Sequence, residues 1–442
     1  LANGTRLSGA RVSHLDIEPG SRRITGAGLA YDRVFDRSGA PVTDPVQINE
    51  SGAARGFSRF CSAAGYAPGD RGFVDRIFFA NEEAAKPYHA HGGTVWALDV
   101  DHAAIHAAPA LGRGAWENVS ALDTGNEDQV ALLLADDHPD APLYLWLGTK
   151  RPHGGFLERN GLSDGQLHVW VSHGPERTPS DRGGAFSGTG AGRTGSFVPV
   201  ETRDPARAGV AGYDDQGYLD ADRLRAAARR LGAFFFSRPE DIDTDPADGR
   251  RAVLASTGHG GINPNDQWGT LYAVRVAWRR SPSGGIEGAD ATLRILYDAD
   301  DPGHRGEGIR SPDNLVWAGD GRIYVQEDRA TPAFGARGQE ASIWVLDPET
   351  SQTRRIARMD RAVVVPAGTS DVQAGEVGAW ESSGILDVTD LLAQGTGSRL
   401  LLATVQAHGI RDGVIAERGL VQGGQLILLE HGAGEETRLP AE

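Results

Sequence analysis

The stretch NLVWAGDGRIYVQED, residues 314–328, is the clearest sign of the fold in this chain of 442 residues. Two short apolar runs are separated by Gly319, Asp320 and Gly321. A glycine and aspartate turn between apolar runs is typical of a tight β-hairpin. The stretch therefore predicts two antiparallel strands, with charged residues directly after the second.

Similar short runs recur along most of the chain. Each has the length of a strand and is bounded by Gly, Asp, Asn or Pro, which end strands in turns. The expected strands are residues 76–80, 94–100, 129–135, 142–148, 167–171, 251–257, 270–276, 293–299, 314–319, 322–327, 342–348, 398–406 and 425–430. Residues 220–234 have a helical pattern, and residues 382–395 contain a second, shorter helical turn.

So many short strands with so little helix predict an all-β protein, and the spacing of strand pairs favours a β-propeller over a sandwich or a barrel. We expect about six blades, although no exact sequence period supports that number. The whole chain, residues 1–442, is interpreted as one propeller domain. Residues 174–217, rich in Gly, Ser, Thr, Pro and Arg, are interpreted as a long inserted loop.

Composition excludes several classes of partner. The formal net charge is −16, so a general nucleic-acid or anionic-membrane surface is not expected. The sequence has no apolar run long enough to span a membrane. One cysteine, one methionine and the acidic excess are compatible with export. We expect a monomer that is secreted or periplasmic.

Acidic residues recur next to the apolar runs, and the single cysteine, Cys61, lies in a turn-rich stretch. An isolated acidic residue of this kind is most often a solvated turn residue, and a lone cysteine is most often an inert buried thiol. If the strands converge on one channel, however, the carboxylates approach one another without enough cations, which implies bound metal. Carboxylates favour Ca²⁺, Mg²⁺, Mn²⁺ or Fe³⁺, whereas a thiolate favours a transition metal. A mixed site is the natural conclusion, and the residues that could contribute to it are Cys61, Glu82, Glu83, Glu117, Glu240, Asp241, Asp313, Glu327, Asp328 and Glu381.

The order of these motifs resembles the PhoX-type alkaline phosphatases. The resemblance covers residues 57–409 and rests on Cys61 followed by the motifs FFANEE, HAHGGTVWALD, GAWEN, FFFSRPED, SPDN with its following ED, WESSG and LLLATVQAHG. It implies a β-propeller whose axial pocket holds iron and calcium, with Mn²⁺ possible in place of iron, and cleaves small-molecule phosphate esters.

The resemblance also assigns roles to individual residues. Cys61 corresponds to a cysteine ligand of iron. Glu82, Glu117, Glu240 and Asp313 correspond to cluster carboxylates, with Glu381 as a further candidate, and Arg238 corresponds to a phosphate-binding arginine. Because Pro239 biases the residue before it toward an extended conformation, Arg238 and Glu240 are expected to leave the strand end in a defined relation.

Three functions remain open at this point. The leading hypothesis is a metal-dependent phosphoesterase that hydrolyses phosphate monoesters. The second is a phosphotriesterase or lactonase-like hydrolase on the same propeller. The third is a non-catalytic binding propeller that calcium stabilises, in which the carboxylates are structural.

Overall fold

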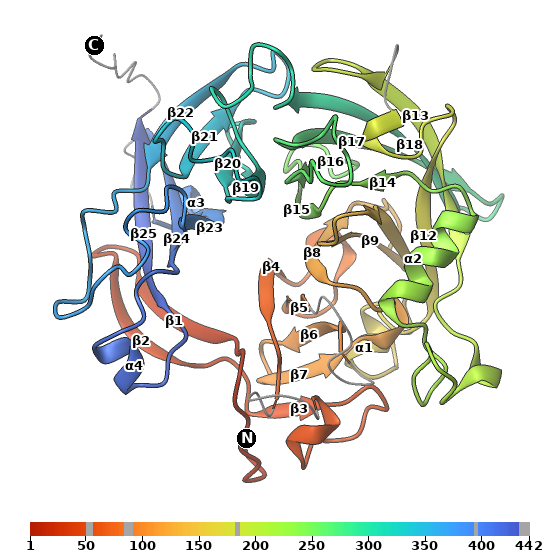
Figure 1. The fold of residues 1–442 in the computed structure, drawn as a ribbon. Coiled ribbons are helices and arrows are strands. Elements are labelled where there is room, and N and C mark those ends of the chain that lie inside the picture. Colours follow the sequence, from red (N-terminus) through yellow and green to blue (C-terminus); the bar gives the residue numbers. More distant parts are fainter. Residues whose placement is uncertain (50–55, 84–91, 182–185, 393–396, 433–442) are drawn as a thin grey trace.

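The computed structural model describes residues 1–49, 56–83, 92–181, 186–392 and 397–432. Almost all of its regular structure is β-sheet, and the sheets are arranged in a ring around a common centre (Figure 1). The helices α1 to α4 lie on the outside of the sheets or in the connections between them (Figure 1).

The first part of the ring is a five-stranded sheet in the order β3-β7-β6-β5-β4. All of its pairs are antiparallel except the parallel pair of β3 with β7. The bounds are β3 Arg33–Phe35, β4 Phe60–Tyr66, β5 Ile77–Glu82, β6 Val95–Asp99 and β7 Ala104–Ala107. A two-stranded sheet precedes it in the chain, β1 Ser13–Glu18 and β2 Arg23–Leu29.

The second part is a nine-stranded sheet in the order β15-β16-β17-β18-β13-β12-β11-β9-β8. Its two ends curve back toward the centre, so β8 and β15 contact each other (Figure 1). The bounds are β8 Trp116–Leu122, β9 Gln129–Asp136, β11 Tyr144–Thr149, β12 Gly165–Ser172, β13 Gly192–Val200, β15 Pro239–Thr244, β16 Arg251–Ser256, β17 Thr270–Arg280 and β18 Ile286–Asp298.

Two smaller sheets continue the ring. One contains β19 Pro312–Trp317, β20 Ile323–Glu327, β21 Ser342–Leu346 and β22 Thr353–Arg358, and the other contains β23 Trp380–Asp387, β24 Ser398–Ala407 and β25 Gly423–Gly432. The short strands β10 Ala141–Pro142 and β14 Phe235–Phe236 pair with each other. The helices are α1 Phe156–Arg159, α2 Ala221–Arg230, α3 Thr389–Leu392 and α4 Val414–Glu417.

The hydrophobic core is divided among the interfaces between neighbouring parts of the ring. One cluster packs Phe79 and Val95 of the five-stranded sheet against Trp116 and Tyr144 of the nine-stranded sheet. Another lies between the two arms of the nine-stranded sheet, and a third joins its second arm to β19, β20 and β21. Apolar side chains thus pack between sheets, and polar residues are left for the strands nearest the centre.

The innermost strands follow one another around the ring. Contacts run from β4 to β8, from β8 to β15, from β15 to β19 and from β19 to β23. The same succession is visible around the centre of Figure 1. Residues far apart in the sequence therefore meet at the axis.

Most of the expected elements are present. Every apolar run predicted as a strand overlaps a strand, and α2 lies within the predicted helical segment 220–234. Within residues 174–217, interpreted as an inserted loop, β13 pairs with both β12 and β18, so this part of the segment is a strand of the sheet. The number of blades and the single-domain organisation stay predictions. None of the described helices has the length and apolar character needed to span a bilayer.

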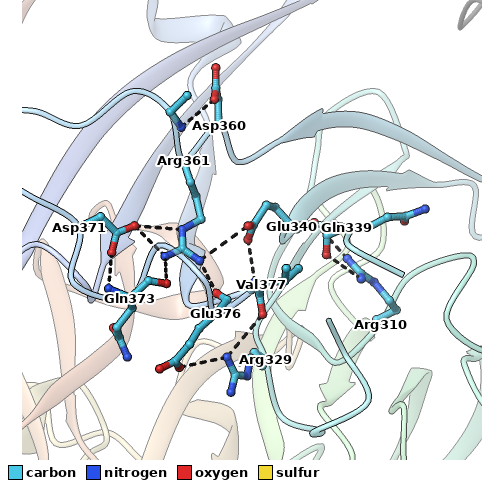
Figure 2. A network of polar contacts seen from close by, with 12 residues as sticks. Arg310, Arg329, Gln339, Glu340, Asp360, Arg361, Asp371, Gln373, Glu376 and Val377 are labelled. Atoms are coloured by element: carbon cyan, nitrogen blue, oxygen red, sulfur yellow. Dashed lines mark hydrogen bonds and ion pairs between the residues drawn. The ribbon is translucent and has the colours of Figure 1, made fainter. Parts of the chain in front are cut away.

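The long connection from β22 to β23 is held by a polar network centred on Arg361 (Figure 2). The Arg361 guanidinium donates to Asp371 at 2.7 Å and to the backbone carbonyls of Gln373 and Glu376, and it lies 3.7 Å from Glu340. Its side chain is almost fully buried. This network fixes the segment that leads into the first residues of β23.

Candidate metal centre and active site

Each innermost strand carries a candidate ligand at its second residue. The five residues are Cys61 on β4, Glu117 on β8, Glu240 on β15, Asp313 on β19 and Glu381 on β23. In the first four strands the pairing register shifts at this position. A bulge leaves a residue out of the regular ladder and redirects its side chain. An irregularity in strand pairing thus directs four of these side chains toward the axis of the ring.

Four of the predicted residues, together with Glu83, form two groups that share Glu117. The ligand atoms of Cys61, Glu83 and Glu117 lie within 4.8 Å of one another, and so do those of Glu117, Glu240 and Asp313. The carboxylates in both groups are buried. A thiol and four carboxyl groups from separate strands therefore converge on one small volume.

The electrostatics of these groups favour a cation at the same place. Burial and the surrounding carboxylates raise the pKa of Glu117, Glu240 and Asp313 well above the ordinary range. Burial and neighbouring Glu117 likewise raise the pKa of the Cys61 thiol. Both carboxylate oxygens of Glu117 are buried without a hydrogen-bond donor among the described residues. Buried carboxylates normally have such partners, so the donor set fits a bound metal ion.

The structure places the two adjacent glutamates after the FFAN motif in different surroundings. Glu82, the predicted ligand, accepts hydrogen bonds from the backbone N–H groups of Ser58 at 3.2 Å and Thr94 at 3.5 Å. Glu83 belongs to the group with Cys61 and Glu117 instead. Successive side chains along an extended chain point to opposite faces, which explains why one of the pair faces the axis and the other does not.

Arg238 lies beside the second group and is held firmly. Its Nε and Nη2 donate to the two carboxylate oxygens of Asp137 at 2.8 and 3.0 Å, and Nη2 lies 2.6 Å from Glu240. Among the described residues, only Nη1 of this guanidinium has no hydrogen bond or ion pair. Arg238 adopts φ 59°, so the expected extended conformation is wrong. A left-handed residue before proline carries strain, which the pairing with Asp137 offsets.

Glu381 lies at the edge of the cluster. Its carboxylate is 3.2 Å from Nε2 of His408, whose Nδ1 lies 2.6 Å from Gln422. Burial and the neighbouring carboxylate of Asp328 raise the pKa of Glu381. Glu381 belongs to neither group of three, so its role as a ligand stays a prediction.

A second set of polar residues, one position further along the inner strands, ties these strands together. Asn118 donates to Ser62 at 3.0 Å, and Ser62 donates to Asp241 at 3.2 Å. Asp241 also accepts from the backbone N–H of Leu315 at 2.9 Å. These bonds connect β4, β8, β15 and β19 and so fix the relative positions of the candidate ligands.

Sequence reasoning did not single out Asp137 or Arg59, and it chose Glu82 rather than Glu83, which lies with Cys61 and Glu117. Asp137 is the second of two aspartates that follow the apolar run 129–135, as other acidic residues follow their runs, so the same pattern could have identified it. Arg59 gave no such signal, because an arginine before a turn-rich stretch is ordinary in a chain whose positive charge is nearly all arginine.

Comparison with known proteins places this site in context. A family model described as alkaline phosphatase PhoX matches residues 73–369, a range that contains Glu83, Glu117, Arg238, Glu240 and Asp313 but neither Cys61 nor Glu381. A search of curated protein sequences finds no match.

The chain was also compared with solved structures. PhoX of Pseudomonas fluorescens, in complex with the transition-state analogue vanadate, is similar with a TM-score of 0.54 and 16% identity, and the match covers 84% of this chain and 69% of that chain. A subtype N11 neuraminidase-like protein of A/flat-faced bat/Peru/033/2010 (H18N11) has a TM-score of 0.29 at 8% identity and covers 87% and 97%. The similarity to the Pseudomonas structure and the all-β ring confirm the predicted propeller fold.

Proposed function

The chain belongs to the alkaline phosphatase PhoX family, and from this premise we propose that it is a metal-dependent phosphoesterase that hydrolyses phosphate monoesters at the axial cluster. The observation that carries the proposal is the convergence of Cys61, Glu83, Glu117, Glu240 and Asp313, with Glu117 shared by both groups. The orphaned oxygens of Glu117 support the same reading, because a structural carboxylate at this depth would have a donor.

The donor set divides by chemical type. Cys61 supplies a thiolate and so favours a transition metal, for which Fe³⁺ or Mn²⁺ is proposed, whereas Glu240 and Asp313 supply oxygen atoms suited to Ca²⁺. When bound, such ions supply positive charge that stabilises the oxygens of a phosphoryl group. The positive ions would offset the negative charge of the carboxylates, so that an anionic ester could approach the cluster.

Arg238 is proposed to contact the substrate. Asp137 engages its Nε and Nη2 edge, which leaves Nη1 to donate one hydrogen bond to a phosphoryl oxygen. Arg238 therefore makes a one-point contact with the phosphoryl group rather than a bidentate one. This arrangement gives a guanidinium whose orientation is fixed before the ester arrives, which lowers the reorganisation that the reaction requires.

The function is tested by measuring kcat/KM for an aryl phosphate monoester, an uncharged phosphotriester and a lactone, with elemental analysis of the purified protein. A clear preference for the monoester together with a transition metal supports the proposal. Preference for the triester or lactone would favour the alternative hydrolase. Bound calcium alone with no turnover would favour the binding propeller.

Arg238 has a matched control in Arg399, which pairs with Asp387 at 2.7 Å and has a similarly low exposure. Arg238→Ala and Arg238→Lys should each lower kcat/KM by roughly 100-fold, about 2.7 kcal/mol of barrier, with metal retained. Arg399→Lys should leave the rate within about threefold of wild type, since it loses only a peripheral ion pair. Wild-type rates in both Arg238 variants would remove this arginine from the site.

A further inference from the structure

Arg59 lies beside the cluster, directly before β4 and two residues before Cys61. Its backbone carbonyl accepts a hydrogen bond from the N–H of Glu83 at 3.0 Å. Its Nε lies 2.8 Å from the Glu83 carboxylate. The side chain of Arg59 is 65% exposed, whereas that of Glu83 is 6% exposed. The guanidinium thus reaches from a buried ligand candidate to solvent.

The charge of Arg59 acts on the cluster as a whole. Burial lowers its pKa, but Glu83, Cys61, Glu117 and Asp137 together raise it above the ordinary value. The guanidinium therefore lies beside a member of the group formed by Cys61, Glu83 and Glu117.

The two arginines near the cluster, Arg59 and Arg238, differ in which guanidinium nitrogens remain free to donate hydrogen bonds. Arg238 is held through Nε and Nη2 by Asp137 and Glu240. Arg59 is held only through Nε, and among the described residues neither Nη1 nor Nη2 has a hydrogen bond or ion pair. These two nitrogens form one edge of a planar guanidinium, which matches two oxygens of a phosphate or carboxylate.

We propose that Arg59 binds two non-bridging oxygens of the phosphoryl group, so that Arg59 provides the two-point contact that Arg238 cannot. This inference rests on the proposed function and adds the substrate class that it favours. Two guanidinium donors suit a dianionic monoester, whereas a triester offers one neutral phosphoryl oxygen and gains little from this edge.

The test compares Arg59→Gln and Arg59→Lys with a matched control, Arg76→Gln. Arg76 is 51% exposed and pairs with Asp101 at 3.4 Å, so it is a similar exposed arginine away from the cluster. For each variant, the affinity for inorganic phosphate is measured both as an inhibition constant and by direct titration. KM for an aryl phosphate monoester and the metal content are measured as well. Both Arg59 variants should weaken phosphate binding by roughly 10-fold or more, as expected for lost charge-assisted hydrogen bonds. Arg76→Gln should bind phosphate as wild type does.

Arg59→Lys separates binding from support of Glu83, because it keeps a positive charge beside that carboxylate but loses the planar edge. Weak phosphate binding with wild-type metal content in this variant supports the proposal. Wild-type phosphate affinity in Arg59→Lys overturns it, even where Arg59→Gln loses metal, because Arg59 then acts only through Glu83. If the wild-type protein binds phosphate through Arg59 but hydrolyses no monoester, the proposed function fails while the binding role stands.

Discussion

Replacing Glu117 by Gln should change stability in opposite directions with and without metal. In the metal-free protein this carboxyl is buried among other carboxyl groups, and among the described residues only the weakly donating Cys61 thiol reaches it. Its pKa is raised, first by burial and then by Glu83 and Asp313. A raised carboxyl pKa opposes folding once the pH exceeds the pKa of the unfolded chain, because folding must then take up a proton.

The size of the change in unfolding free energy follows from the cost of keeping that proton on Glu117. Folding must keep Glu117 protonated above the unfolded value of 4.5, and this costs about 1.4 kcal/mol for each pH unit up to the raised pKa of the folded protein. The neutral amide of Gln carries no such cost. Glu117→Gln should therefore stabilise the chelator-treated protein by about 1.4 kcal/mol for each pH unit of that range, less the cost of burying an amide without partners.

The assay is urea unfolding of the chelator-treated protein at pH 7.5, with metal content measured before and after treatment. The matched control is Glu327→Gln, because Glu327 is equally buried but pairs with Arg310 at 2.7 Å and with the indole N–H of Trp344 at 3.0 Å. That variant leaves a buried arginine uncompensated and should destabilise the protein by about 3–5 kcal/mol. Metal uptake should fail only in Glu117→Gln. If both variants destabilise the metal-free protein alike, Glu117 is a structural carboxylate and the reasoning is refuted.

Three further outcomes are expected. Cys61→Ser should lose the transition metal and most activity while the melting temperature of the metal-free protein stays near wild type, because a hydroxyl is a poor substitute for thiolate; full metal content would return Cys61 to an inert thiol. Asp137→Asn should lower kcat/KM by roughly 10-fold to 100-fold, since Arg238 loses its charged partner, and a rate within about threefold of wild type would contradict this. Burial lowers the pKa of His106 to about 4, so folding excludes a proton that the unfolded chain binds, and stability should fall as the pH drops from about 6.5 to about 4. His106→Gln should show a smaller fall in melting temperature over that range, and an unchanged fall would show that other groups dominate.

The outer strands could be predicted from the sequence because they are apolar on both faces. Runs such as residues 129–135 and 142–148 pack between neighbouring parts of the ring, and their hydrophobicity marks them as buried strands. The same patterning missed most of the innermost strands. β4, β8, β15 and β23 contain cysteine, glutamate, aspartate, asparagine and serine residues, since they face the axis rather than a hydrophobic interface.

The candidate site was predicted in composition but not in geometry. The motifs identified Cys61, Glu117, Glu240 and Asp313, which the structure brings together. They placed the carboxylates next to apolar runs and Cys61 in a turn-rich stretch, whereas each of the four is the second residue of an inner strand of its own. The choice between Glu82 and Glu83 depends on which face of one strand points inward, and a register error of one residue reverses it.

The pairing of one candidate ligand with each inner strand has a consequence for how the protein matures. Because the candidate ligands of the two groups come from segments spread between Cys61 and Asp313, no short segment of the chain can assemble the cluster alone. Bringing such distant segments together is slow, since loop-closure entropy is lost before the contacts form. A metal that binds only the closed ring stabilises it relative to every partly folded form. Metal binding would then follow closure of the ring, and a chain interrupted before β19 would lack a complete set of candidate ligands.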